Sequence, residues 1–590
     1  MSNPKLRAVL FFPRRILWLI LAFLVMTTVV FALAQTWGGA PVQIPGSDQP
    51  VWRQYLQYWG GMLRGDLGFS LRSGQPVTEV IGQCLPMTLQ LLGLATLAGM
   101  VLSALVILAG SLVLVLRDRA AIPGEILQRL GQVGVTLGMA APVFVLGLWL
   151  LRLFAFGLEW MPSGGWGEPG PDGGFSLRHA ILPVLALATL PACLVARSML
   201  GEIARYRTSG GNRSALILHA ALSFFHHGLI QAIGMLGGTL IVELLFSLPG
   251  TGRLFIQSIM FIDRPVTLGL ANLFLLLSLL LRAGADLVQG LDGFVLPSLQ
   301  PSEPKAEALP AETFSSVRTL RRVWIGFCLL LVVVPFAQGM IGFLTGGEKI
   351  VEQNVADRNL PPGGESADGS VYAWGTDTLG RDIRARAHYA LGVNLGSSLL
   401  VALAVLLLAL PGGLLAGYLA RRGAVWADLL DDAIMFPAEA LMSLPGLVLL
   451  TFILVAAGPG IVNLLVWLGL AFLLPRSVCM VRDWWMTATP GKSPWLRLAG
   501  VSLGVLLLGT GVAVITQSVM GFVGLGTPPP QPDLGAMLMG GMRTMIMSPQ
   551  AALRPGWVLL YAALGWFLLA DALLSAFGLY GRKAWLLLNR

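Results

Sequence analysis

The short pattern Gly491-Lys492-Ser493 has the residue types of a phosphate-binding loop. That motif also needs a glycine five residues before the Gly-Lys pair, where this chain has Met486. Prolines flank the pattern on both sides, and no strand precedes it. We therefore interpret it as a basic turn. We expect this chain to bind no cofactor, so that any ATP-driven work belongs to another polypeptide.

Three imidazoles at helical spacing are the next candidates for chemistry, because histidines on one face can ligate a metal. His219, His226 and His227 carry them, with no carboxylate or cysteine nearby in the sequence. We predict an interfacial role for them and no metal site. The four cysteines (Cys84, Cys193, Cys328 and Cys479) are solitary and are typical of apolar filler rather than disulfides.

Two carboxylates lie inside strongly apolar runs: Glu243 in LIVELLF and Asp571 in FLLADALL. A charge in hydrocarbon costs about 2.5–3.5 kcal/mol on insertion scales, so both should face a bundle interior or an aqueous cavity. Two isolated carboxylates make a poor proton relay. They favour a passively gated path over a proton-coupled one.

The elements that position these groups follow from composition. Of 590 residues, 55% are hydrophobic and 12% are charged, about half the charged share of a soluble domain. This excludes a soluble globule and a disordered chain and indicates a polytopic membrane protein in a lipid bilayer. The net charge of +9 agrees with basic cytoplasmic loops, and we expect no nucleic-acid partner.

Apolar runs long enough to cross a bilayer predict an all-α protein with about twelve transmembrane helices in two six-helix halves. A secretory signal is the alternative for the first run, which we interpret as a retained helix. The halves are residues 1–297 and 317–590, joined by a hydrophilic linker at 298–316. The predicted spans are 16–35, 86–116, 131–157, 180–200, 226–246 and 266–285, then 323–345, 393–418, 441–458, 461–480, 501–522 and 556–577.

Cations in the short loops predict the orientation. If the helices alternate, pairs such as Arg14/Arg15, Arg117/Arg119 and Arg421/Arg422 fall on one side, which is then cytoplasmic and holds both termini and the linker. Each half also has a long external polar segment after its first helix (36–85 and 346–392) and a turn rich in glycine and proline after its fifth. These matching positions indicate parallel repeats with a pathway between them.

The external segments contain two compact motifs. The motif of the first half includes Gly65, Asp66 and Gly68. The motif of the second half consists of Gly375-Thr376-Asp377 and Gly380-Arg381-Asp382. Glycine and aspartate supply turns, an aspartate can cap a helix, and an arginine can pair with it. An ordered surface and direct contact with another protein both remain open as roles of these motifs. The turns at Pro249-Gly250 and 528–530 are expected to shape the external mouth of the pathway.

Several of these segments resemble the permease subunits of dipeptide/oligopeptide- and nickel-type ABC importers. Residues 55–99 and VELLFSLPGTGRL (242–254) resemble the B-type subunit, and WGTDTLGRDIRARAHYALGVNLGSSL (374–399) and GFVGLGTPPPQPDLGAML (521–538) resemble the C-type subunit. The chain is therefore similar to a fusion of the two, with a fold like that of a type I ABC importer permease. The resemblance implies a bacterial inner-membrane protein that passes peptides or a similar small solute and is not an enzyme.

The resemblance also implies partners: two cytoplasmic ATPase subunits and an extracytoplasmic solute-binding protein. The ATPases would grip the loop between the fourth and fifth helices of each half. Those loops are GEIARYRTSGGNRS (201–214) and WWMTATPGKSPWLRLAG (484–500), shorter than or different from the family pattern. An ATPase-uncoupled scaffold and a secondary transporter therefore remain alternatives. The candidate coupling residues are Glu202, Arg205, Arg207, Arg213, Lys492 and Arg497.

Overall fold

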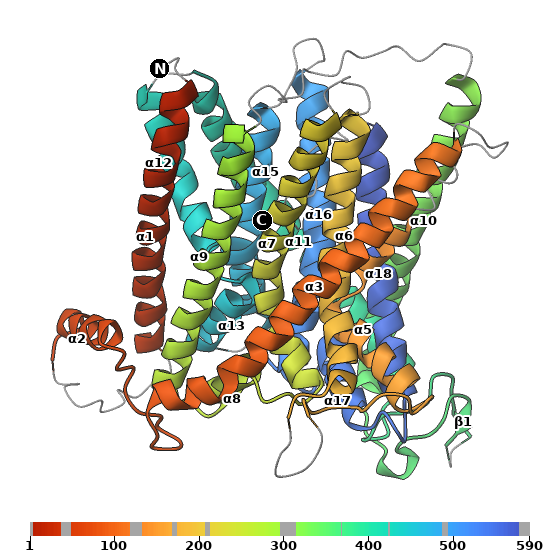
Figure 1. Cartoon of the computed structure of the whole chain (residues 1–590). Helices are drawn as coiled ribbons and strands as arrows, with labels where there is room; N and C mark the ends of the chain where they lie inside the picture. Colours follow the sequence, from red (N-terminus) through yellow and green to blue (C-terminus); the bar gives the residue numbers. More distant parts are fainter. Residues whose placement is uncertain are drawn as a thin grey trace.

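A computed structural model shows the protein as a bundle of long helices (Figure 1). Helices suit apolar segments in a bilayer because every backbone N–H and C=O is satisfied within the segment. The structure describes residues 4–36, 49–117, 133–167, 174–206, 213–295, 314–366, 369–422, 425–458, 460–486 and 494–576.

The first half contains five long helices and one bent pair. The long helices are α1 (Pro4–Thr36), α3 (Val77–Arg117), α6 (Leu177–Tyr206), α7 (Arg213–Leu245) and α9 (Arg264–Val295). The bent pair is Val133–Ala140 with Val143–Ala155; its second arm holds α5 (Val143–Leu150) and a π-helical turn, η1 (Leu151–Ala155). Two shorter helices, α2 (Val51–Leu63) and α8 (Thr251–Met260), complete this half.

The second half repeats this order of elements. Its long helices are α10 (Phe314–Thr345), α11 (Ile383–Arg422), the continuous run α14 (Ile461–Trp467), η6 (Leu468–Leu473) and α15 (Leu474–Met486), then α16 (Pro494–Val523) and α18 (Gln550–Ala576). The bent pair is α12 (Val425–Leu441) with α13 (Gly446–Ala457), and the short helix α17 (Leu534–Arg543) matches α8. Between α10 and α11 lie two 3₁₀ turns, η4 (Gly347–Ile350) and η5 (Val355–Asp357), and an antiparallel hairpin of β1 (Gly364–Glu365) and β2 (Val371–Tyr372).

Ten described helices are long and apolar enough to cross a membrane, and each bent pair could supply one more span. The predicted polytopic all-α class is confirmed. The expectation of a continuous span at 131–157 is wrong, because this segment bends by 94°. The predicted span at 441–458 begins at a bend of 79°, and most of it is the continuous helix α13. Pro142 and Pro445 are the N-caps of α5 and α13, and each disfavours helical backbone at the residue before it, which ends the preceding arm.

Several predicted boundaries are also corrected. The spans predicted to begin at 86 and 393 begin nine and ten residues earlier, at Val77 and Ile383. Their first turns carry polar residues, which hydropathy excludes but helical hydrogen bonding accepts. The predicted linker at 298–316 lies outside the described residues, apart from the last three positions, which begin α10.

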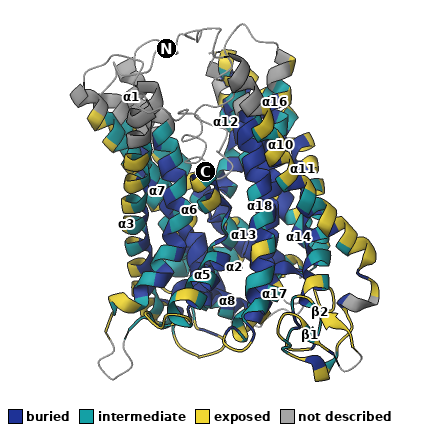
Figure 2. Ribbon diagram, turned by 90° about the vertical axis from the view of Figure 1, so that its right-hand side faces the viewer, coloured by how far each residue is buried: buried dark blue, intermediate teal, exposed yellow. Residues whose placement is uncertain are grey.

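The two ends of the bundle differ. We call the end where α1 begins the N-terminal end; α8, α17 and the β1–β2 hairpin lie at the opposite end (Figures 1 and 2). One buried apolar cluster runs through both halves and includes Met26, Phe144, Phe274, Phe522 and Phe567. Helix α1 packs on α9 of its own half and on α12 and α13 of the other, and α5 packs on α18. The halves therefore share one core.

Candidate functional site

The surface where the two halves meet, here called the seam, is the place where a pathway between them would open. Toward the opposite end it is closed by aromatic pairs. The ring centroids of Phe144 on α5 and Phe522 on α16 are 5.1 Å apart, and those of Trp149 on α5 and Trp557 on α18 are 4.2 Å apart. These contacts are apolar, and at these separations aromatic rings attract one another beyond the gain from burial.

Nearer the N-terminal end the seam is closed by charge. Arg197 of α6 donates to Asp571 of α18, and Arg197 Nη1 also lies 3.4 Å from the Thr136 hydroxyl. The exposed fractions of the two charged side chains are 12% and 7%. Asp571, treated from the sequence as an isolated carboxylate, thus has a cationic partner from the other half. Nothing in the local sequence around position 571 could have revealed it, because the partner is 374 residues away.

The second predicted intramembrane carboxylate, Glu243, is fully buried in α7. Its Oε1 accepts from the Thr88 hydroxyl of α3 at 2.8 Å, and its Oε2 accepts from the Arg253 backbone N–H in the first turn of α8 at 2.8 Å. Thr88 Oγ1 in turn accepts from the Thr251 N–H at 2.8 Å. Glu243 therefore ties α3, α7 and the start of α8 together, away from the ion pair at Asp571.

The second half has a neutral version of this arrangement. Gln517 of α16 donates to the Ser398 hydroxyl of α11 and accepts from the Ser397 hydroxyl, both at 3.1 Å. In each half a buried polar side chain thus holds the fourth long helix to the second. An amide takes the place of the carboxylate in the second half, so the link between α11 and α16 is made by neutral groups.

The first external motif forms the turn that leads into α3. Gly65 and Gly68 have φ of +78° and +80°, the left-handed region that favours glycine, and Asp66 Oδ1 accepts from the Gly68 N–H at 2.9 Å. The turn is fastened at Asp263, between α8 and α9. This carboxylate accepts from the Ser70 hydroxyl at 2.5 Å and from the Leu71 N–H at 3.1 Å. Sequence reasoning assigned no role to Asp263.

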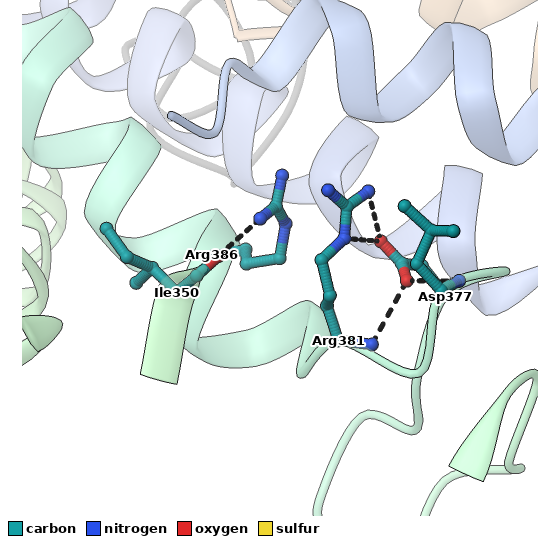
Figure 3. Close-up of polar contacts among 5 residues, drawn as sticks. Ile350, Asp377, Arg381 and Arg386 are labelled. Atoms are coloured by element: carbon teal, nitrogen blue, oxygen red, sulfur yellow. Dashed lines mark hydrogen bonds and ion pairs between the residues drawn. The ribbon is translucent and has the colours of Figure 1, made fainter. Parts of the chain in front are cut away.

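The second external motif is a closed turn at the start of α11 (Figure 3). Asp377 accepts from the Arg381 guanidinium at 2.7–2.8 Å, and Asp382 Oδ1 accepts from the Arg384 N–H at 2.7 Å in the first turn of α11. Arg386, buried below the turn, donates to the Ile350 carbonyl. The pairing and capping expected from these residue types are both present.

Two further residues of this motif hold its shape. Thr376 is fully buried, accepts from the Leu360 N–H at 2.9 Å and donates to the Asp357 carbonyl. Gly375 has a φ of +78°, and a Cβ there would lie 2.3 Å from the Leu360 carbonyl oxygen. Only glycine fits. The motif is therefore a rigid surface at the opposite end of the bundle.

The fifth-helix turn of the second half borders a pocket of about 440 Å³, lined by Asn463, Thr527, Gln531 and the prolines 528–530 among others. Asp533 lies just beyond it, buried, and caps α17 by accepting from the Ala536 N–H at 2.9 Å. Burial raises the pKa of Asp533 to about 6, although backbone hydrogen bonds from Ala536, Gly535 and Thr527 act in the other direction.

The candidate coupling residues lie in or beside two segments that fall outside the described residues. Arg207 and Lys492 lie outside the described residues. Glu202 and Arg205 fall in the last turns of α6, Arg213 begins α7, and Arg497 lies in the first turn of α16, all without described side chains. These positions border the two gaps after α6 and α15, so the ATPase-contact role remains a prediction.

Comparison with known proteins adds independent information. A dipeptide transport system permease of Lactococcus lactis subsp. cremoris is 30% identical over 285 residues, which cover 43% of this chain and 88% of that protein. A glutathione transport system permease of Escherichia coli O6:H1 is 30% identical over 41% of this chain and 78% of its own length. A dipeptide permease of Escherichia coli K12 is 29% identical over 48% and 96%. No protein-family model matches the chain.

Each of these relatives is matched over most of its length by less than half of this chain. The relatives are transport permeases, and the described helices are those of a multi-pass membrane protein. This chain belongs to the family of membrane permeases of dipeptide- and glutathione-type ABC transport systems.

Proposed function

We propose that this chain forms by itself the translocation pathway of a peptide-type ABC importer. Residues 1–297 act as one permease, residues 317–590 as the other, and residues 298–316 join them. One observation carries the proposal: less than half of the chain matches up to 96% of a whole permease, and the same order of helices occurs twice around a shared core. A solute path between parallel repeats is the arrangement that such a duplication supports.

The relatives are permeases of dipeptide and glutathione systems, so a short peptide is the solute class proposed for this chain. The chain itself catalyses no reaction and binds no cofactor. Two cytoplasmic ATPase subunits supply the driving force through the segments after α6 and α15, and an extracytoplasmic binding protein delivers the solute. Both termini are cytoplasmic in a bacterial inner membrane, as the cations near residues 14–15 and 421–422 indicate.

The experiment is purification of the tagged full chain from its native membranes in a mild detergent, with the stoichiometry of co-purifying proteins measured by native mass spectrometry. We expect two ATPase copies per chain. Uptake of a radiolabelled dipeptide should then depend on ATP in proteoliposomes that contain the complex. An intact chain that carries no nucleotide-binding partner would favour the uncoupled scaffold, and uptake driven by an ion gradient without ATPase would favour a secondary transporter.

A further inference from the structure

One carboxylate of the seam occurs at a matching place in each half. Asp286 is the 23rd residue of α9 and Asp571 is the 22nd residue of α18. Both acidic residues are within the last ten residues of the last long helix of their half. The repeat therefore places one carboxylate per half near the N-terminal end of the bundle.

Each of these carboxylates is held by an arginine that links it to the other half. Asp571 of the second half binds Arg197 of the first directly. Asp286 of the first half binds Arg15 of α1, with Nε and Oδ2 2.6 Å apart, and Arg15 Nη1 lies 3.6 Å from Glu439 Oε2 of α12 in the second half. Both linkages cross the seam toward the N-terminal end of the bundle.

The two linkages are not identical, which argues against a mere consequence of the repeat. Arg197 lies on α6, in the half opposite to its carboxylate Asp571. Arg15 lies on α1, in the same half as Asp286, and reaches the other half through Glu439. Arginines on two different helices therefore make the two linkages across the seam.

Charge gives such a linkage two favourable arrangements. With the seam closed, arginine and carboxylate satisfy each other; the side chains are 12% and 7% exposed in Arg197–Asp571 and 25% and 10% exposed in Arg15–Asp286. With the seam open to water at that end, both groups become hydrated. A partly opened seam is unfavourable because it separates the charges before water reaches them. The aromatic pairs toward the opposite end carry no such condition, since apolar surfaces separate without leaving a buried charge.

We propose that Arg197–Asp571 and Arg15–Asp286–Glu439 are two seam locks that hold the halves together at the N-terminal end and that release when the pathway opens to that side. The inference rests on the proposed function in that an alternating pathway is what the locks would control. When the pathway opens to the N-terminal end, each carboxylate loses its arginine partner and is hydrated instead.

The test measures distances and needs neither ATPase, binding protein nor peptide, so it can succeed or fail independently of the proposed function. In full-length chain lacking native cysteines and held in lipid nanodiscs, spin labels go on Leu108 of α3 and Leu415 of α11, which are 67% and 52% exposed. A second labelled pair, Leu153 and Ile546, reports on the opposite end; these residues are 53% and 77% exposed. Pulsed electron–electron double resonance gives both distance distributions.

Arg197→Ala and Asp571→Ala should each shift the Leu108–Leu415 distribution to longer distances, and the exchanged pair Arg197→Asp with Asp571→Arg should restore much of the original distribution. Arg178→Ala is the matched control, an arginine of the same helix that is exposed and donates to the Trp160 carbonyl of its own half. An unchanged Leu153–Ile546 distribution shows that each variant is folded. Singles that match the control, or an exchanged pair no better than the singles, would overturn the proposal.

A second measurement covers the case in which the single variants fold poorly. Arg15→Ala removes the second lock and leaves the more deeply buried Arg197–Asp571 pair intact, and the Arg15 side chain is 25% exposed, so this variant should fold. Its Leu108–Leu415 distribution should also shift to longer distances. A folded Arg15→Ala variant with the distribution of the unsubstituted chain would overturn the second lock.

Discussion

Replacement of Glu243 is the sharpest test of how the buried polar contacts hold the first half. The carboxylate accepts from the Thr88 hydroxyl and the Arg253 N–H, each at 2.8 Å, and is fully buried. Glu243→Ala leaves both donors without that acceptor in a dry site. A buried donor left unsatisfied costs about 1–3 kcal/mol, so the two together should lower the free energy of unfolding by about 2–6 kcal/mol.

Glu243→Gln separates shape from charge. Thr88 Oγ1 already accepts from the Thr251 N–H and hydroxyl, at 2.8 and 3.0 Å, so its own hydrogen is the one given to residue 243. If the glutamine oxygen takes that hydrogen, its NH₂ group faces the Arg253 N–H, donor against donor. The amide can therefore satisfy one of the two contacts, and its effect should fall between those of the wild type and the alanine variant.

The assay is the apparent melting temperature of each variant in nanodiscs, with hydrogen exchange over residues 251–260 to locate the change. Glu79→Ala is the matched control, because Glu79 is an exposed carboxylate in the first turn of α3, where the helix dipole contributes about 0.3–1 kcal/mol. The reasoning is refuted if Glu243→Ala melts no lower than Glu79→Ala, or if exchange in α8 stays at the wild-type rate.

Three further outcomes concern the end of the bundle opposite to the N-terminal end. Gly380→Ala should expose residues 346–382 to limited proteolysis, because the φ of Gly380 is +72° and a Cβ would lie 1.7 Å from the Asn354 carbonyl oxygen; Gly74→Ala, at φ +68° with open space around it, should not. The pKa of Asp533 is raised from 3.8 to about 6, so protonated Asp533 should stabilise the fold below pH 4, and this contribution should be lost as the pH rises through 6. The melting temperature of Asp533→Asn should therefore depend less on pH between 4 and 7 than that of the unsubstituted chain. An equal pH dependence of the two melting temperatures contradicts the assignment. Arg381→Ala should lower the melting temperature more than Arg384→Ala, because Arg381 pairs with Asp377 whereas Arg384 is exposed. Such a pair near the surface contributes only up to about 1 kcal/mol, so the difference should be small. Equal melting temperatures would show that the pair contributes nothing.

Much of the fold could be read from hydropathy, since apolar runs of bilayer length have few alternatives to helix. The errors came where that rule does not apply. The bends after 140 and 441 place prolines at the start of a new arm, and an apolar proline does not interrupt a hydropathy profile. Helices α8 and α17 are short and buried against other helices, so their sequences look like turns until packing is known.

The candidate site was predictable only in part. The turn at 375–382 was foreseen because its contacts join residues within a few positions of one another, and local chemistry decides them. The roles of Arg197 and Asp263 were not foreseen, because their partners are 374 and 193 residues away. A sequence shows that a buried charge needs a partner, but it does not show which one.

The sequence by itself determined that this chain is a multi-pass membrane protein, and it indicated that the order of elements occurs twice, because these properties depend on composition and on neighbours in the chain. Only the tertiary structure decided how the two copies meet: aromatic rings toward one end of the seam and arginine–carboxylate linkages toward the other. The physical reason is that burial and charge pairing are properties of surfaces brought together by folding, and equivalent residues in a repeat need not find equivalent partners.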